Sequence, residues 1–424
     1  MAWITQDAPT RDELSACIQC GLCLPLCPTF RLTGMESASP RGRLMMMSAV
    51  AGGQAEVNDV FHDLMSFCLQ CRACEVVCPS LVPFGRAMEG ARIEIAAQLP
   101  SPVRKGRGLI TGRFIAMPGM MRLVTRVARF VKTMVPAKYL PRQVRTSIGG
   151  LRDLPSRPSS TIGRSYVPLS DPAYGIAAVL SGCVMDPWFE DVHEATVGVL
   201  LRAGYRIVFP EGQTCCGALA AHDGDAAGTR RLAKRNVRAF AAADLVVTDA
   251  AGCGAHLKEY GHWAGDAGEI LASKVKDVTE VVAEALTDGR LPHLDVPRGA
   301  VAMQDPCHLR HVQRIVEQPR EIVRAAGYEP VEIDEAGMCC GAAGMYSVLQ
   351  PSASAELGEK KADQVRASGS TIVASANPGC EIQLRGYLGG GYRVAHPVEL
   401  YWEALQAVDG KPLGWRPPTE TAVD

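Results

Sequence analysis

The sequence predicts an α+β protein in which a small helical module precedes two copies of one α/β unit, each with a parallel sheet. Two observations carry this prediction. The 16 cysteines of the 424-residue chain form two separate groups, eight between Cys17 and Cys78 and eight between Cys183 and Cys380. In the second group the cysteines recur at a nearly constant separation and follow short apolar segments that alternate with helical patterns, which is typical of parallel α/β sheets.

Composition and the N-terminus narrow the class of protein. Apolar residues make up 47% and charged residues 21%, so the chain can bury a core and is not disordered. The formal net charge of -1 argues against nucleic acid as a partner. We see neither a signal peptide nor an apolar run near the ~20 residues of a membrane-spanning helix. We therefore expect a cytoplasmic chain, in which closely spaced, reduced cysteines indicate metal or redox chemistry.

The first group of cysteines consists of two runs with the same spacing. Each run reads C-x2-C-x2-C-x3-C-P, once from Cys17 to Pro28 and again from Cys68 to Pro79. This is the pattern of bacterial two-cluster ferredoxins, in which the fourth cysteine of each run binds the cluster of the other run. We therefore assign Cys17, Cys20, Cys23 and Cys78 to one [4Fe-4S] cluster, and Cys68, Cys71, Cys74 and Cys27 to a second. Zinc fits less well, because zinc sites usually join two C-x2-C units across a longer gap.

The segment between the two runs is longer than a minimal ferredoxin needs. Met45–Val50 and Val57–Met65 are predicted to be helices inserted there, which pack within an alpha-helical ferredoxin module. Arg41 and Arg43 lie just before the first of them. They could face the clusters or a partner, and a solvated pair is an equal alternative.

A basic connector follows the cysteine runs. From Val103 to Arg152 there are twelve Lys or Arg residues and no Asp or Glu. An amphipathic helix is predicted between Pro118 and Pro136. Its apolar residues are Met120, Leu123, Val124, Val127, Phe130, Val131 and Met134, and its opposite side carries Arg122, Arg126 and Arg129. Three interpretations remain open: packing on the chain's own acidic body, docking of a partner subunit, and contact with anionic lipid. A Pro/Ser-rich linker begins at Leu154.

The second half of the chain contains an internal repeat. Three cysteine positions recur 124 residues later and a fourth recurs 127 residues later. The matched positions are Cys183 with Cys307, Cys215 with Cys339, Cys216 with Cys340, and Cys253 with Cys380. The surroundings recur too, because short apolar strands lead to the first and last cysteine of each copy and a glycine follows each vicinal pair.

Each copy is predicted to carry one site. Ligands of parallel α/β sheets bind beyond the carboxyl ends of the strands, where these cysteines fall. The predicted metal ligands are Cys183, Cys215, Cys216 and Cys253 in the first copy, and Cys307, Cys339, Cys340 and Cys380 in the second. Zinc, or a role as small buried apolar residues, are the alternatives. His308, His222 and His256 could be ligands or proton relays, but core or surface histidines are the favoured interpretation.

These motifs resemble a known family. The segments Asp305–His308, Met338–Tyr346 and Asn377–Cys380 are similar to the cysteine-rich CCG domains of heterodisulfide reductases and their relatives. With a two-cluster ferredoxin in front, the chain resembles the iron-sulfur subunits of glycolate oxidase (glycolate dehydrogenase). The fullest CCG motif has a fifth cysteine, where this chain has Ala250 and Asn377. That departure argues against non-cubane clusters and disulfide cleavage.

The resemblance implies an electron-transfer role. Relatives of this kind work with FAD-binding subunits that oxidise glycolate or D-lactate, and electrons pass on to a quinone or another acceptor. It implies two [4Fe-4S] clusters, with a further Fe-S cluster or zinc in each CCG module, and a location that includes the cytoplasmic face of the membrane by peripheral contact. The sequence shows no dinucleotide or ATP motif, so no catalytic residue is expected in this chain.

Three other functions stay open at this point. The chain could be a heterodisulfide-reductase-like thiol/disulfide redox subunit, the iron-sulfur subunit of anaerobic glycerol-3-phosphate dehydrogenase, or a zinc-stabilised binding module. The predicted domains are a two-cluster ferredoxin over residues 1–100 and a basic connector with linker over 101–170. Two CCG modules follow, over 171–296 and 297–424.

Overall fold

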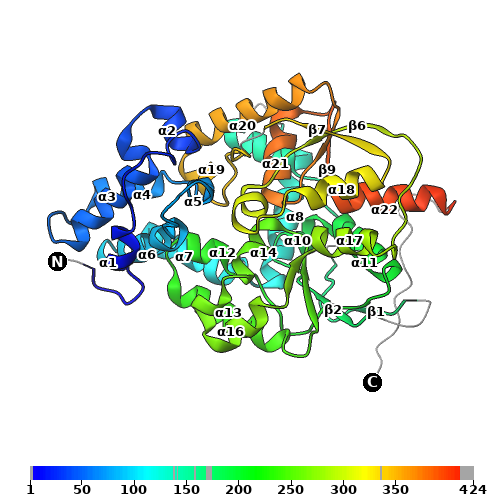
Figure 1. Ribbon diagram of the computed structural model, residues 1–424, viewed down its shortest axis with the longest axis horizontal. Coiled ribbons are helices and arrows are strands. Elements are labelled where there is room, and N and C mark those ends of the chain that lie inside the picture. Colours follow the sequence, from blue (N-terminus) through cyan, green and yellow to red (C-terminus); the bar gives the residue numbers. More distant parts are fainter. Residues whose placement is uncertain are drawn as a thin grey trace.

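The computed structural model describes residues 3–136, 139–140, 142–156, 159–168, 174–334 and 337–410. Lys138 of the basic connector, part of the linker and residues 411–424 therefore lie outside the described residues. The N-terminal helices form one end of the molecule, and both sheets lie toward the other end (Figure 1). The predicted α+β class, with a helical N-terminal module and parallel sheets in the C-terminal part, is confirmed.

Short helices build the N-terminal module. Both helices predicted between the cysteine runs are present, and the first begins earlier than predicted because Ser39 caps it and Pro40 occupies its first position. Met47, Phe61, Met65 and Met88 are fully or almost fully buried in the shared core. The helices are α1 (Arg11–Ser15), α2 (Pro28–Thr33), α3 (Pro40–Ala51), α4 (Asp59–Ser66), α5 (Ala73–Val76) and α6 (Phe84–Gln98), with a 3-10 turn over Glu36–Ala38.

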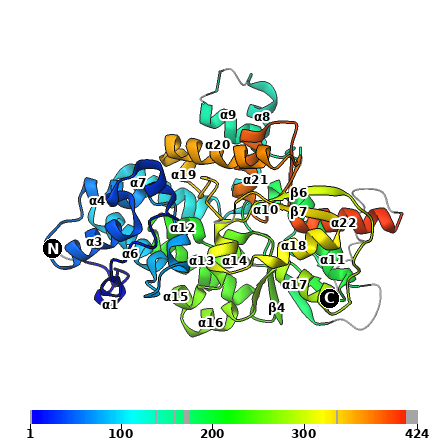
Figure 2. The same cartoon turned by 45° about the horizontal axis from the view of Figure 1, so that its top comes forward.

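The connector is helical, and its main helix, α8, has the predicted bounds. The elements are α7 (Pro102–Leu109), a π-helical turn η2 (Ile110–Phe114), α8 (Pro118–Met134) and α9 (Arg142–Gly150). Helix α9 packs closely on α21 (Pro378–Leu388), because a Cβ on Gly150 would lie 1.9 Å from the carbonyl oxygen of Ile382. Helices α8 and α9 lie at the top of the molecule in Figure 2.

Most of the apolar side of α8 is not packed on the chain's own body. Met121 and Thr125 are buried residues of this helix, and the Thr125 hydroxyl accepts a hydrogen bond of 2.9 Å from Trp188 Nε1. Leu123, Val127 and Phe130 are instead between 52% and 60% exposed. The helix meets the body along this narrow seam, so its apolar stripe faces outward.

Two sheets follow, and both have the same order of parallel strands. The first sheet is ordered β1-β3-β2-β4-β5 and the second β7-β6-β8-β9. Ala177 of β2 lies opposite Ile207 of β3 and Leu245 of β4 in the first, and Ala302 of β6 lies opposite Val331 of β7 and Val373 of β8 in the second. The strands are β2 (Ile176–Val179), β3 (Arg206–Val208), β4 (Leu245–Thr248), β5 (Val275–Asp277), β6 (Gly299–Met303), β7 (Tyr328–Glu332), β8 (Ile372–Ala374) and β9 (Arg393–Ala395).

One strand departs from the predicted parallel arrangement. The short β1 (Ser165–Tyr166) comes from the linker and pairs antiparallel with β3 at the sheet edge. An antiparallel edge strand on an otherwise parallel sheet is a common arrangement, and this one covers an edge that would otherwise be unpaired.

Helices cover the sheets and join the two copies through a common core. Helix α11 packs on α22, and α17 packs on α18. Their buried side chains, which include Leu200, Val281, Ile322 and Tyr401, form one continuous hydrophobic cluster. The helices that flank the sheets are α10 (Met185–Trp188), α11 (Glu190–Arg202), α12 (Ala218–His222), α13 (Ala226–Ala239), α14 (Ala251–Leu257), α15 (Tyr260–Ala264), α16 (Asp266–Ala272), α17 (Val278–Thr287), α18 (Glu317–Ala325), α19 (Tyr346–Leu349), α20 (Pro351–Ala367), α21 and α22 (Pro397–Val408), with a π-helical turn η4 (His308–Val312).

Candidate metal centres

The two N-terminal cysteine runs have the same unusual backbone. Gln19 and Gly21 in the first run have φ angles of 58° and 82°, and Gln70 and Arg72 at the equivalent positions of the second have 53° and 59°. Alternating left-handed residues turn successive backbone N–H groups toward one side, which creates a concave site for an anionic group. In the second run the N–H of Gln70 lies 3.4 Å from the Sγ of Cys68. The runs are therefore shaped to surround negatively charged sulfur.

The structure brings the first predicted set of cysteines to one cavity. Its volume is about 30 Å³. Cys20 is exposed, and burial raises the pKa of the Cys23 thiol to about 11. The cysteines that line the cavity are Cys17, Cys20, Cys23 and Cys78, together with Cys74 of the second predicted set. Cys78, from the other run, thus stands with the three cysteines of the first run.

The second predicted set lies deeper. Cys27, Cys68 and Cys74 are buried, and Cys71 is half-buried. Burial raises the pKa of Cys71 and Cys74, and the charges of Cys27 and Cys68 act on both thiols in the same direction. These four cysteines are therefore electrostatic neighbours, although Cys27 comes from the first run.

Arg43 supports the second set in a way that the sequence did not indicate. It is fully buried, so the alternative of a solvated pair is wrong for this residue. Its guanidinium donates hydrogen bonds to the Ala38 carbonyl at 2.7 Å and to Thr29 Oγ1 at 3.1 Å, and Thr29 Oγ1 lies 3.2 Å from Cys27 Sγ. Arg41 faces the first run, where it donates to the Gln19 carbonyl at 2.9 Å.

The first α/β copy gathers its four cysteines beyond the carboxyl ends of β2, β3 and β4. Cys183 Sγ and Cys215 Sγ are 3.3 Å apart. Gly217 follows the vicinal pair with a φ of 98°, which a residue with a side chain rarely adopts. The fully buried Tyr260 donates to the Cys216 carbonyl at 2.6 Å. Cys253 lies on α14, and its thiol raises the pKa of Cys216, after the larger effect of Cys215.

The second copy repeats this arrangement. Gly341 has a φ of 87°, as Gly217 does in the first copy. Cys307 raises the pKa of Cys339, and Cys340 raises the pKa of Cys380, so the four thiols are again mutual neighbours. Cys339, Cys340 and Cys380 are buried.

Asn377 joins the two α/β sites. Its Oδ1 accepts a hydrogen bond of 3.1 Å from the N–H of Gly252, which precedes Cys253. Its Nδ2 donates to Cys380 Sγ at 3.5 Å. The residue at the fifth-cysteine position thus contacts one site directly and the backbone of the other.

The second ferredoxin set is next to the second α/β set. Cys71 packs in one cluster with Cys307, Cys339 and Tyr346. Tyr346 also donates a hydrogen bond of 3.2 Å to the Phe67 carbonyl, which precedes Cys68.

The three histidines singled out in the sequence lie in the same region. His308 Nδ1 is 3.5 Å from Cys307 Sγ, the rings of His222 and His308 are 5.6 Å apart, and burial lowers the pKa of His256 to about 4.

The first ferredoxin set suits a cluster better than a single ion, whereas Cys183 and Cys215 of the first α/β copy are only 3.3 Å apart and do not distinguish the two. Four thiolates around one zinc ion would lie about 4 Å apart, since Zn–S bonds are about 2.3 Å long. In the described part of the chain, no three His, Cys, Asp or Glu side chains come together as ligands of a single metal ion. The iron and sulfur atoms of a cubane separate its four ligands, which fits cysteines spaced around a cavity.

Two family models match the chain. A 4Fe-4S dicluster domain matches residues 13–82, and a cysteine-rich domain matches residues 177–258 and again 301–385. The fold and these matches define the class: an iron-sulfur protein with a dicluster ferredoxin module and two cysteine-rich modules.

Comparison with curated proteins gives the family. The probable glycolate oxidase iron-sulfur subunit of Bacillus subtilis (strain 168) is 35% identical over 92% of this chain and 94% of its own length. The glycolate oxidase iron-sulfur subunit of Escherichia coli (strain K12) is 29% identical over 93% and 94%. Lactate utilization protein A of Geobacillus kaustophilus is 31% identical over 51% of this chain and 95% of its own length. The chain belongs to the family of glycolate oxidase iron-sulfur subunits.

Among the described residues, no helix is both long enough and apolar enough to cross a membrane.

Proposed function

We propose that this chain is the iron-sulfur electron-transfer subunit of a flavin-dependent 2-hydroxy acid dehydrogenase that oxidises glycolate or D-lactate. The observation that carries the proposal is the proximity of cysteines within the predicted sets, such as Cys17, Cys20, Cys23 and Cys78 around one cavity and Cys183 beside Cys215. A partner subunit would hold FAD and perform the hydride chemistry, and the clusters bound here would supply one-electron steps toward a quinone or another acceptor.

The residues of this chain would hold and tune the clusters. Cys17, Cys20, Cys23 and Cys78 would bind one [4Fe-4S] cluster, and Cys27, Cys68, Cys71 and Cys74 a second. The cysteine set of each CCG module would bind a further metal centre. Backbone N–H groups of the two runs and the side chain of Asn377 would donate to the sulfurs, which favours the more negative, reduced state.

The packing supports an order for the centres. Cys71 and Cys307 pack against one hydrophobic cluster, which supports a second ferredoxin site beside the second CCG site, and Asn377 continues from there to the backbone beside Cys253. The exposure of Cys20 supports placing the first ferredoxin site nearest to solvent. Electrons would therefore enter or leave through the first ferredoxin site and the CCG modules would lie further along the path.

Purification with the partner subunits under anaerobic conditions tests this function. We expect roughly 8–16 Fe per chain, little zinc, and stoichiometric flavin on the partner. Glycolate or D-lactate should bleach the iron-sulfur absorbance of the complex but not of this chain alone. A complex without iron or without flavin would contradict the function, whereas reduction by neither acid would reject only the choice of substrates.

We also propose that α8 contacts the anionic lipid of the membrane that contains the quinone. Leu123, Val127 and Phe130 are exposed apolar side chains on a helix that also carries Arg122 and Arg126. The absence of acidic residues from Val103 to Arg152 makes this surface complementary to negatively charged headgroups.

Replacing Phe130 with Glu should abolish this contact. We expect the variant to bind vesicles of phosphatidylcholine and phosphatidylserine about tenfold more weakly or worse, because an inserted aromatic ring is exchanged for a charge that the lipid repels. Flotation of the whole chain with such vesicles measures the effect. Ile270→Glu, at a residue that is 62% exposed on α16, is the matched control and should bind normally. Equal binding by both variants would exclude α8 as the lipid contact.

A further inference from the structure

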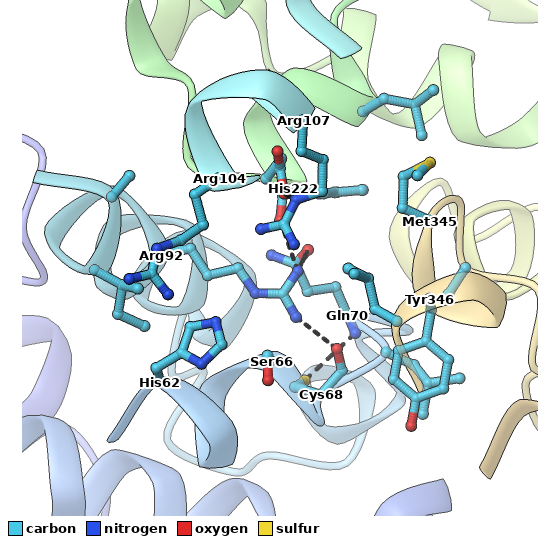
Figure 3. Close-up of a pocket in the computed structure, with 17 residues that line it drawn as sticks. His62, Ser66, Cys68, Gln70, Arg92, Arg104, Arg107, His222, Met345 and Tyr346 are labelled. Atoms are coloured by element: carbon cyan, nitrogen blue, oxygen red, sulfur yellow. Dashed lines mark hydrogen bonds and ion pairs between the residues drawn. The ribbon is translucent and has the colours of Figure 1, made fainter. Parts of the chain in front are cut away.

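A cavity lies where the ferredoxin module meets both α/β copies, directly against Cys68. Its volume is about 70 Å³. Gln70 and Arg92 line it from the N-terminal module, Asp223 from the first copy and Tyr346 from the second, as Figure 3 shows for the residues it labels. Apart from Cys68 and the backbone N–H of Gln70, the functions proposed above do not use the residues of this cavity.

Two hydrogen-bond donors at the cavity have no partner. Gln70 is only 3% exposed, and its Nε2 makes no hydrogen bond to any residue that the structure describes. Its Oε1 accepts a hydrogen bond of 2.9 Å from Arg92, which fixes the amide so that Nε2 is the free end. Arg92 Nε is likewise buried and without a partner among the described residues. Unsatisfied buried donors cost free energy, so they indicate a missing acceptor.

The charges around the cavity favour an anionic acceptor. Arg92, Arg104 and Arg107 contribute three guanidinium groups to the lining, and Figure 3 shows those of Arg92 and Arg107 directed toward its interior. The Arg104 guanidinium is held at the side, where its Nε donates to the Leu99 carbonyl at 2.8 Å. Asp223, the acidic residue among the described lining side chains, forms an ion pair with Arg107. Apart from the thiolate of Cys68, two positive charges remain, and guanidinium groups match the paired oxygens of carboxylates and phosphates.

We propose that this cavity binds a small oxyanion, either inorganic phosphate or a short carboxylate. Because a buried water needs roughly 10–15 Å³ of such volume, the cavity holds about five waters, or one anion of that size. Gln70 Nε2 and Arg92 Nε donate to its oxygens, and Arg104 and Arg107 supply the charge. The binding site stands independently of the proposed function.

The position of the anion has a redox consequence that does rest on the proposed function. A negative charge beside Cys68 makes the second cluster harder to reduce, so the anion lowers its midpoint potential. By linkage, reduction of that cluster weakens anion binding by the corresponding factor. The affinity of the cavity for the anion therefore depends on the redox state of the second cluster.

Calorimetric titration of the purified, cluster-containing chain tests the binding. Phosphate, sulfate, glycolate and glyoxylate are titrated separately at matched ionic strength, which separates the phosphate and carboxylate classes. We expect one equivalent of one class to bind. Gln70→Glu, which places a carboxylate where the amide donor was, should weaken binding about tenfold or more, and Arg107→Gln should weaken it in the same direction.

Gln54→Glu is the matched control, because Gln54 is an exposed residue of the same N-terminal module that lies outside both cysteine runs and does not line this cavity. It should bind the anion as the unmodified chain does. Binding of no anion, or binding that Gln70→Glu leaves unchanged, would overturn the proposal.

An EPR-monitored redox titration then compares the chain with and without the anion. Binding without a shift in potential would reject the redox linkage alone, and absence of iron would reject the proposed function while leaving the binding result intact.

Discussion

The variants Cys27→Ala and Cys68→Ala are expected to lose the same [4Fe-4S] signal, although the two residues come from different runs. Each should lower the iron content by about four atoms per chain, because a cubane is not retained on three thiolates here. Cys17→Ala and Cys78→Ala should together define the other signal, since Cys78 shares the first cavity with Cys17. Iron analysis and EPR spectra of the dithionite-reduced chains measure both effects.

The backbone of the runs explains why these losses should be large. Gln19, Gln70 and Arg72 keep left-handed φ angles that cost about 1 kcal/mol or more each unless their surroundings enforce them. We expect the bound clusters to enforce them, so the N-terminal module should also lose thermal stability when a cluster is missing.

Ile18→Ala is the control for these cysteine variants. Ile18 lies inside the first run and is 67% exposed, so both signals should persist. If Cys27→Ala instead resembled Cys17→Ala, each run would hold its own cluster and the exchange of the fourth cysteine would be wrong.

Local patterns make the main features of this chain predictable. The spacing of cysteines within a run involves only a few neighbouring residues. The internal repeat is found by comparing two segments of one sequence. Neither feature requires knowledge of how the chain packs. Pro118 and Pro136 similarly predict the bounds of α8, because proline acts on the backbone next to it. The strands leading to Cys253 and Cys380 are predictable for the same reason.

Features that depend on distant contacts are not predictable in this way. The apolar stripe of α8 indicates a helix but not which side meets the body, and here Thr125 makes that contact. Burial of Arg43 depends on the Leu64 carbonyl, which accepts from its Nε at 2.9 Å across 21 residues. The sequence marks Asn377 only as a missing cysteine, because its contact with Gly252 spans 125 residues. The oxyanion cavity likewise needs three parts of the chain to meet.

Replacing Arg152 with Met is expected to destabilise the chain by about 3–5 kcal/mol. Arg152 ends the basic connector, and its guanidinium is bonded to two carboxylates of the second α/β copy. Its Nε is 2.6 Å from Glu381 Oε1 and its Nη1 is 2.6 Å from Glu399 Oε1. The exposed fractions of the three side chains are 11%, 2% and 8%, so the variant leaves Glu399 buried without its cation and Glu381 with only the more distant Arg385, 3.8 Å away. Chemical unfolding followed by circular dichroism measures the loss.

Lys360→Met provides the contrast. Lys360 forms an ion pair with Glu356 on α20, and both side chains are more than half exposed. Removing it should cost less than about 1 kcal/mol, because water and salt screen such pairs. Equal losses in the two variants would show that the Arg152 pairs are not effectively buried.

The pH dependence of Arg152→Met identifies the cause of its instability. Burial raises the pKa of Glu381, and Arg152 opposes that rise. Burial acts in the same direction on Glu399, where Arg152 prevails and the pKa is lowered. Without the guanidinium, both folded-state pKa values should lie above the unfolded value of about 4.3. The folded variant then binds more protons than its unfolded chain, so its stability should increase as the pH falls. We expect the variant to lose less unfolding free energy, relative to the unmodified chain, at about pH 5 than at about pH 8. A loss that does not change with pH would mean that lost packing, and not unpaired charge, destabilises the variant.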